Sequence, residues 1–161
     1  MEHLPTLADD GLATPEVGSW AEDKYQLVRC YATIFANSMS TKWKSLVYVD
    51  LFAGAGRSRI RENNRIIPAS PLVALDIAKP FSKYIFAELD NDKISALKQR
   101  VRKTHPDKDV VFVQGDCNER VEDIEVAIPR SSKDNGVLVF CFVDPYNLAN
   151  LRFSTILSLA P

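Results

Sequence analysis

The chain has 161 residues, of which 46% are hydrophobic and 25% are charged, and its formal net charge is −1. These totals fit one globular domain with a core large enough to fold without disulfides, and they argue against an overall electrostatic attraction to nucleic acid. Cys30, Cys117 and Cys141 are widely spaced and form no CxxC motif, so the sequence supports neither a disulfide framework nor a metal site. We expect a soluble cytoplasmic protein without a membrane segment, because the sequence shows no apolar leader and no run of roughly 20 apolar residues.

The first 39 residues divide into an expected arm and an expected helix. Residues 1–18 mix prolines and glycines with acidic residues and show no sustained hydrophobic period, so we expect a loose N-terminal arm. Ser19 and Glu22 have the spacing of a capping box, in which the two side chains satisfy free N–H groups at the start of a helix. Apolar residues then recur near helical spacing, which predicts a helix over residues 19–39 that packs against the sheet.

From residue 46 onward, strand-like and helix-like segments alternate. We expect strands at 46–52, 83–89, 109–114 and 137–144, separated by helices at 70–79, 91–103 and 118–128. This alternation predicts a parallel sheet, and strands that are apolar almost throughout predict helices on both faces. The expected fold is therefore α/β, with a doubly wound, Rossmann-like, mainly parallel sheet. The domain expected over 19–161 ends soon after its fourth strand, so a sheet truncated at this point is compatible with the sequence.

The segment at residues 49–56, VDLFAGAG, is the strongest sign of a ligand site. An apolar strand ends in Asp50, and a turn built only from small residues follows, which lets backbone N–H groups approach a ligand closely. Three later strands also end near an acid: Glu88 in FAELD, Asp116 in GDCN and Asp144 in FVDPY. Because ligands of open α/β sheets lie outside the carboxyl ends of the strands, we expect these four ends to form one site.

The spacing of these residues suits S-adenosylmethionine better than a dinucleotide. A dinucleotide fingerprint needs a third glycine or an alanine where this chain has Arg59, and an acid earlier than Glu88. S-adenosylmethionine has no pyrophosphate. Asp50 could face the ammonium of its amino acid tail, Glu88 could accept both ribose hydroxyls, and Asp116 could accept the adenine amine.

Six ordered segments between residues 20 and 146 carry a family resemblance. They are WAEDKYQLVRCY, YVDLFAGAGRS, SPLVAL, FAELD, GDCN and FVDPY. The run resembles S-adenosylmethionine-dependent methyltransferases, and more closely the three-Cys-motif partner protein family (TcmP), a bacterial group with a methyltransferase-like Rossmann domain. The resemblance implies S-adenosylmethionine as cofactor and a partner protein with three clustered cysteines. The expected cofactor-binding residues are Asp50, Phe52, Ala53, Gly54, Gly56, Glu88, Leu89, Asp116 and Cys117.

The segment FVDPY holds the expected catalytic residues Asp144, Pro145 and Tyr146. Methyl transfer from a sulfonium is a direct displacement, so the protein has mainly to align the two reactants and accept a proton. Asp144 is the best candidate for orienting an acceptor N–H or O–H, and Tyr146 would form an aromatic wall. Methyltransferases that act on the amines of bases often carry Asp-Pro-Pro-aromatic here. This chain has a single proline in the segment, so the motif does not predict base methylation.

Plainer interpretations remain open for the same residues. The glycines can simply make a tight turn, Asp90 and Asp116 can cap helices, and Asp144 with Pro145 can turn the chain. Cys117 lacks an evident base and is not expected to act as a nucleophile.

Two function classes also remain open. The acceptor of a methyltransferase could be a nucleic acid, because an expected loop with Arg57, Arg59, Arg61 and Arg65 could clamp phosphates, or it could be a protein. The alternative is a catalytically inactive module that binds a three-cysteine partner protein.

Overall fold

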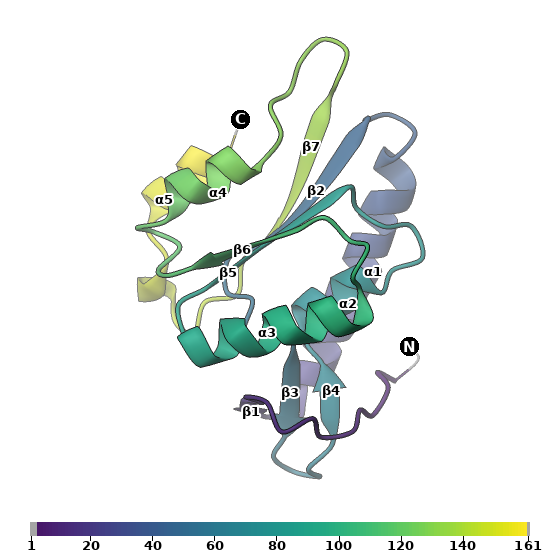
Figure 1. Ribbon diagram of the computed structural model, residues 1–161, viewed down its shortest axis with the longest axis vertical. Helices are drawn as coiled ribbons and strands as arrows, with labels where there is room; N and C mark the ends of the chain where they lie inside the picture. The colour runs from purple at the N-terminus through teal and green to yellow at the C-terminus, as the bar shows by residue number, and fades with distance from the viewer. Residues whose placement is uncertain (1–2, 161) are drawn as a thin grey trace.

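The computed structural model describes residues 3–160 and has a four-stranded, fully parallel sheet at its centre (Figure 1). The order across the sheet is β6-β5-β2-β7. The strands are β2 (Ser45–Asp50), β5 (Lys83–Glu88), β6 (Val110–Gln114) and β7 (Val137–Phe142). The predicted α/β class with a mainly parallel sheet is confirmed. Later strands are added on both sides of β2, so the strand order reverses at its carboxyl end, where open sheets form a ligand crevice.

Helices cover both faces of this sheet (Figure 1). One face carries α1 (Trp20–Met39), α2 (Ser70–Leu75) and α3 (Asn91–Thr104). The other carries α4 (Val121–Ala127) and α5 (Phe153–Leu159), with a short 3₁₀ helix, η1 (Leu148–Asn150), before α5. Within residues 3–160, no helix is both long enough and apolar enough to cross a membrane.

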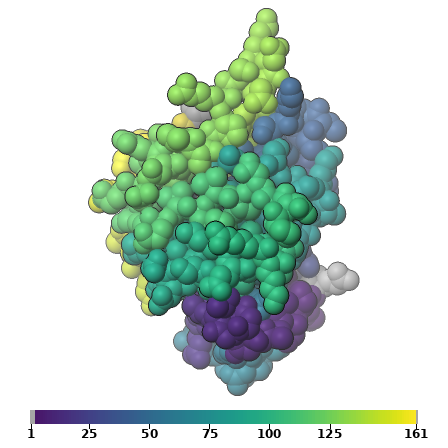
Figure 2. All heavy atoms as spheres, in the orientation of Figure 1, coloured from purple at the N-terminus to yellow at the C-terminus, as the bar shows by residue number. Residues whose placement is uncertain are grey.

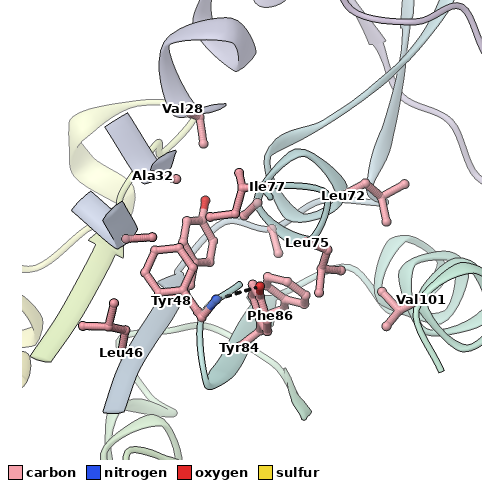
Figure 3. Close-up of a cluster of buried hydrophobic side chains, with 14 of the residues drawn as sticks. Val28, Ala32, Leu46, Tyr48, Leu72, Leu75, Ile77, Tyr84, Phe86 and Val101 are labelled. Carbon is pink, nitrogen blue, oxygen red and sulfur yellow. Dashed lines mark hydrogen bonds between the residues drawn. The ribbon is translucent and has the colours of Figure 1, made fainter. Parts of the chain in front are cut away.

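The two faces of the sheet bury different side chains. Because successive residues of a strand point to opposite faces, Tyr48 enters the core under α1 while Val47 and Val49 enter the core under α4. The Tyr48 ring packs edge-on against Phe86 (Figure 3). It also stacks on Phe140, with ring centroids 5.6 Å apart. The larger, aromatic core therefore lies on the side of the longer helices.

A second, smaller sheet lies below the first and was not predicted (Figure 1). It consists of β1 (Glu16–Val17), β3 (Arg57–Ile60) and β4 (Ile66–Pro68). β1 runs parallel to β3, and β3 and β4 are antiparallel. The expected arginine-rich loop is therefore wrong, because the segment RSRI alternates and points Ser58 and Ile60 inward as a strand does.

The N-terminal segment also differs from the expected loose arm. Leu4 is buried in a core with Ile60 and Ile67, and Leu7 forms a β-bridge with Ile66. Figure 2 shows this segment, in purple, lying against the hairpin of the small sheet and below α3. Its composition hid this packing because the contacts join residues about 60 positions apart.

The predicted helices lie close to the observed ones, but α4 begins at Val121 and not at residue 118, and the cap predicted for α1 is absent. α1 begins at Trp20, one residue after the predicted start, but Ser19 makes no side-chain cap and Glu22 instead pairs with Arg65 at 3.0 Å. Ser70 is the first residue of α2, after its N-cap Ala69.

Candidate functional site

The carboxyl ends of the four parallel strands open into one cleft of about 780 Å³. Gly54 after β2, Glu88 at the end of β5, Asp116 after β6 and Asp144 after β7 all line it. The predicted residues found in its walls are Phe52, Ala53, Gly54, Glu88, Leu89, Asp116, Cys117, Asp144, Pro145 and Tyr146. Two predicted residues, Asp50 and Gly56, do not line the cleft. The structure thus brings the four strand ends together and moves two residues of the first motif behind the cleft wall.

The glycine turn leaves open space at the cleft wall. Gly54 has a φ of +64°, in the left-handed region that favours glycine, and a Cβ built on it would meet no atom within 4 Å. The Ala53 N–H donates to the Ala87 carbonyl at 2.9 Å, which fixes the turn against β5. The turn is therefore held by backbone contacts while its cleft side stays free for a ligand.

Glu88 connects the ends of β2 and β5. Its Oε2 accepts a hydrogen bond from the Gly54 N–H at 2.8 Å, and its Oε1 accepts one from the Asp90 N–H at 2.8 Å. A carboxylate offers about four lone-pair positions, so each oxygen can accept one further hydrogen bond. Asp90 caps α3 by accepting from the N–H groups of Asp92 and Lys93, which confirms the capping interpretation for Asp90.

Asp50 lies fully buried beneath the turn. Its Oδ1 accepts from the Phe52 N–H at 3.1 Å, and its Oδ2 has no hydrogen-bond partner among the described residues. Burial raises the pKa of Asp50 from 3.8 to about 7, against the opposing effects of the nearby Ser70 hydroxyl and the Phe52 N–H. Asp50 therefore shapes the turn from below, and it does not itself line the cleft in which a ligand ammonium is expected.

Gly56 serves packing. A Cβ at this position would lie 2.7 Å from a methyl group of Leu97 on α3 and 3.3 Å from Leu72 on α2. The glycine lets the loop approach both helices closely, and its φ of +80° would strain any other residue.

Asp116 and Cys117 form the wall after β6. Asp116 Oδ1 accepts from the backbone N–H and the side-chain amide of Asn118, at 2.8 and 2.7 Å. It does not cap α4, whose N-cap is Arg120. Cys117 is buried, and burial raises the pKa of its thiol to about 11, which agrees with the expectation that it is no nucleophile.

Asn118, which sequence reasoning missed, ties two walls of the cleft together. Its side-chain amide donates to the Asn150 carbonyl, and its Oδ1 accepts from the Arg152 N–H and the Thr155 hydroxyl, each at 2.8 Å. The segment after β7 is thereby fixed to the segment after β6. An asparagine in GDCN followed by a helix gives no sequence signal for a partner more than 30 residues away.

Asp144, after β7, forms an ion pair with a residue of the neighbouring helix α1. Lys24 Nζ on α1 lies 2.5 Å from Asp144 Oδ2, and the Asp144 side chain is 40% exposed. Tyr146, two residues later, is 99% exposed and also lines the cleft. The acceptor side of the cleft therefore holds a charged pair beside an aromatic ring that contacts solvent almost completely.

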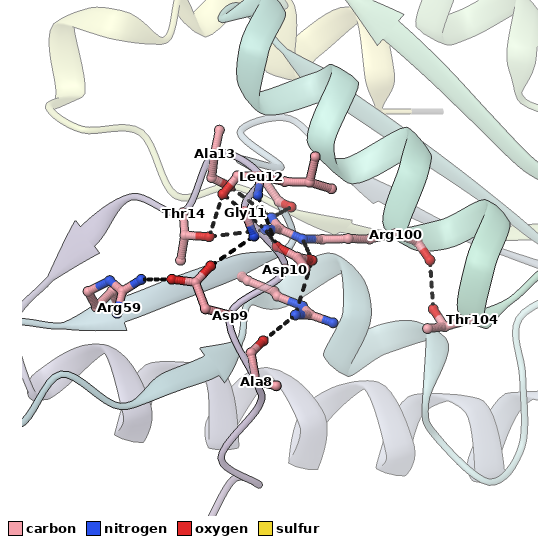
Figure 4. Close-up of polar contacts among 12 residues, drawn as sticks. Ala8, Asp9, Asp10, Gly11, Leu12, Ala13, Thr14, Arg59, Arg100 and Thr104 are labelled. Atoms are coloured by element: carbon pink, nitrogen blue, oxygen red, sulfur yellow. Dashed lines mark hydrogen bonds and ion pairs between the residues drawn. The ribbon is translucent and has the colours of Figure 1, made fainter.

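Arg100, on α3, anchors the N-terminal segment to the glycine turn. Its guanidinium pairs with Asp10 through two contacts of 2.8 and 2.6 Å and donates to the carbonyls of Ala13 and Ala55 (Figure 4). Arg100 is only 2% exposed, and its guanidinium lowers the pKa of Asp10 to about 2. Since Ala55 belongs to the glycine turn, one buried cation holds the turn and the N-terminal segment in register.

Three of the four arginines expected to clamp phosphates are engaged within the protein. Arg57 donates to the Ala8 carbonyl, Arg59 pairs with Asp9 and Arg65 pairs with Glu22. The fourth, Arg61, lines the cleft as Arg57 does, but it makes no ion pair among residues 3–160. Arg57 and Arg59 of β3, and Arg65 just before β4, thus stabilise the N-terminal segment and its junction with α1.

Comparison with known proteins adds no family assignment. No protein-family model matches the chain, and no curated protein matches it. The functional conclusion therefore depends on the cleft and on the resemblance of the motifs.

Proposed function

We propose that the cleft binds S-adenosylmethionine in a Rossmann-like, methyltransferase-type fold and that the protein transfers the methyl group to an acceptor held beside Asp144. One observation carries the proposal: the Glu88 carboxylate at the end of β5 accepts a hydrogen bond from the Gly54 N–H after β2. This contact unites the acid expected at the ribose and the glycine turn expected at the amino acid tail. The parallel sheet and the motif resemblance support the same proposal.

The groups of the cleft suit the parts of this cofactor in order. The open space beside Gly54 would take the amino acid tail. Glu88 would accept from the ribose hydroxyls with its unused lone pairs, and Asp116 would accept from the adenine amine. Leu89, which is 67% exposed, and Cys117 line the cleft and would contact the adenine ring. Leu89 would gain burial from that contact.

The proposed reaction requires no covalent bond to the protein. When bound, S-adenosylmethionine supplies a methyl group on a positively charged sulfur. The acceptor atom forms a bond to the methyl carbon as the S–C bond breaks, and the electron pair of that bond goes to sulfur. Asp144 would orient the acceptor N–H or O–H and take its proton, once Lys24 has released the carboxylate. Tyr146 would shield the reacting atoms from water.

Calorimetry followed by a transfer assay tests the proposal. The protein should bind S-adenosylmethionine and S-adenosylhomocysteine and should not bind NADH. Incubation with methyl-labelled S-adenosylmethionine and bacterial RNA, DNA or protein should then transfer label to one of these fractions. A folded protein that binds neither form of the cofactor would overturn the proposal.

A second candidate function, protein binding without methyl transfer, has its own supporting observation. An apolar groove between α1 and β7 is lined by Leu27, Tyr31, Ile34, Phe140 and Phe142. Leu27, Tyr31 and Ile34 are each at least 45% exposed, and β7 pairs with a described strand only on its β2 side. Exposed apolar surface beside a free strand edge is typical of interaction sites. Co-purification of a three-cysteine protein together with absence of methyl transfer would favour this function.

A further inference from the structure

The rim of the cleft on the α1 side carries a tryptophan that is exposed and yet fixed in place. Trp20, the first residue of α1, is 60% exposed and lines the cleft. A Cβ at Gly18 would lie 2.6 Å from Trp20 Nε1, so the indole rests directly on the Gly18 backbone. On the other side, the Lys24 ammonium lies 4.9 Å from the ring centroid, at a distance typical of cation–π contact. The ring is therefore held in position while a large part of it contacts solvent.

The same lysine joins this ring to the candidate proton acceptor. Lys24 Nζ also lies 4.8 Å from the centroid of the Tyr25 ring, whose hydroxyl is 3.2 Å from Ser58 Oγ. Its third partner is the Asp144 carboxylate, 2.5 Å away. Trp20, Lys24 and Asp144 therefore form a connected row across the mouth of the cleft.

Tyr146, two residues after Asp144, lines the same cleft, so the charged pair shares this cleft with two exposed aromatic residues, Trp20 and Tyr146. A side chain that is 99% exposed contributes nothing to the core, and stacking on a planar ligand would remove its apolar face from water. The ammonium of Lys24 is a hydrogen-bond donor and the carboxylate of Asp144 is an acceptor, only 2.5 Å apart. This pair matches a ligand edge that presents an acceptor beside an amino group, as the edges of adenine and cytosine do.

We infer that Trp20, Lys24, Asp144 and Tyr146 form the acceptor subsite, and that the acceptor is a nucleobase with an exocyclic amine, either in a mononucleotide or in a single strand. This inference rests on the proposed function. Asp144 accepts from the amine and Lys24 donates to the neighbouring ring nitrogen or carbonyl, while the two aromatic rings stack on the base. The amine nitrogen then forms the bond to the methyl carbon as the S–C bond breaks, and its proton passes to Asp144. An aliphatic amine, such as that of a lysine side chain, offers no planar face for either ring.

The charges at the rim are compatible with both a free nucleotide and a strand. Arg61 and Lys93 line the cleft and could contact phosphates, but Glu16 lies in the same wall. The base is the chemistry that both sources share. The test below therefore compares the two sources directly.

Tryptophan fluorescence can report on this subsite alone. The chain has two tryptophans, and Trp43→Phe removes the one that packs against Gly136, away from the cleft. In this background, with S-adenosylhomocysteine at saturation, AMP, CMP and a mixed-sequence single-stranded oligonucleotide should each be titrated. We expect saturable quenching of Trp20 by base-containing ligands and none by a lysine-containing peptide.

Matched variants separate the subsite from other exposed aromatic surface. Tyr146→Ala and Lys24→Met should each weaken binding roughly tenfold, as expected for a lost stacking or charged contact. Tyr31→Ala should leave binding unchanged, because Tyr31 is 61% exposed on the same helix but lies outside the cleft. Calorimetry with the unsubstituted chain should give the same dissociation constants, which excludes an effect of Trp43→Phe itself.

Each outcome decides the inference. If the oligonucleotide binds more tightly than AMP and CMP, the acceptor base belongs to a strand. If AMP or CMP binds as tightly as the oligonucleotide, the acceptor is a free nucleotide. Binding of S-adenosylhomocysteine without any base-dependent quenching would overturn the inference and leave the proposed function standing. If S-adenosylhomocysteine itself does not bind, the proposed function fails. Repeating the base titration without S-adenosylhomocysteine then shows whether a base still binds beside Trp20 and Tyr146.

Discussion

The two sides of the cleft differ in how firmly the protein holds them. On the side of the glycine turn, backbone hydrogen bonds, the buried Arg100 and the Glu88 carboxylate fix the chain. On the side of β7, Asn118 holds residues 150–155, but Asp144 is linked to α1 by a partly exposed ion pair with Lys24, and Tyr146 lies in solvent. The difference suits a protein that presents a formed cofactor site and completes its acceptor site when the second ligand arrives.

On the side of the glycine turn, we expect substitution of Arg100 to lower stability most. Replacement by methionine keeps much of the side-chain volume but leaves Asp10 and two carbonyls without their buried donor. We expect the free energy of unfolding to fall by about 3 to 5 kcal/mol. Urea denaturation measures this, with Arg102→Met on the exposed face of α3 as control, expected to change stability by under about 0.5 kcal/mol. A loss below about 1 kcal/mol would mean that Arg100 acts only like a surface charge.

The buried Asp50 should make stability depend on pH. Its pKa rises from 3.8 in the unfolded chain to about 7 in the folded protein, so the folded state retains a proton that the unfolded chain releases. The free energy of unfolding should therefore fall by a few kcal/mol as pH rises from 3.8 to about 7, and level off above that range. Asp10, with its pKa lowered to about 2, acts in the opposite direction and only below 3.8.

Asp50→Asn isolates this effect, because asparagine still offers an oxygen to the Phe52 N–H and does not titrate. Denaturation at a series of pH values should show the slope between pH 4 and 7 disappear in this variant. The same slope in both proteins would assign the pH dependence to other groups.

The contact between the two strand ends is tested at Glu88. Glu88→Ala should weaken binding of S-adenosylhomocysteine by about 1.5 to 3 kcal/mol, because charge-assisted hydrogen bonds to the ribose are lost. Calorimetry compares this variant with Glu122→Ala, which removes an exposed carboxylate on α4 and should bind normally. Unchanged affinity in a folded Glu88→Ala protein would remove Glu88 from the ribose site.

The smallest effect is expected at Arg59. Its ion pair with Asp9 joins two partly exposed side chains, so Arg59→Ala should lower stability by less than about 1 kcal/mol. Nucleic-acid binding, where present, should also be unaffected, because this guanidinium points to the N-terminal segment. A large loss of binding in a retardation assay would restore the phosphate clamp that the structure argues against.

The sequence predicted the central sheet because each of its strands is a short apolar run bounded by polar or turn residues. It also predicted most of the cleft, since the carboxyl ends of parallel strands must meet at one edge. It did not predict the N-terminal packing, which depends on contacts such as Arg100 with Asp10, 90 residues apart in the chain. Nor did it separate Gly54, which faces the cleft, from Gly56, which faces Leu97, because two glycines in a turn look alike before their neighbours are known.

Amide chemical shifts in a ¹⁵N-labelled sample test the central claim most directly. Titration with S-adenosylhomocysteine should shift the N–H signals of Gly54, Leu89 and Cys117 together, with one dissociation constant, because these residues belong to three different strand ends of one cleft. The signals of Leu27 and Ile34 in the α1 groove should stay in place. Shifts confined to that groove, or no saturable shift in a folded protein, would contradict the account.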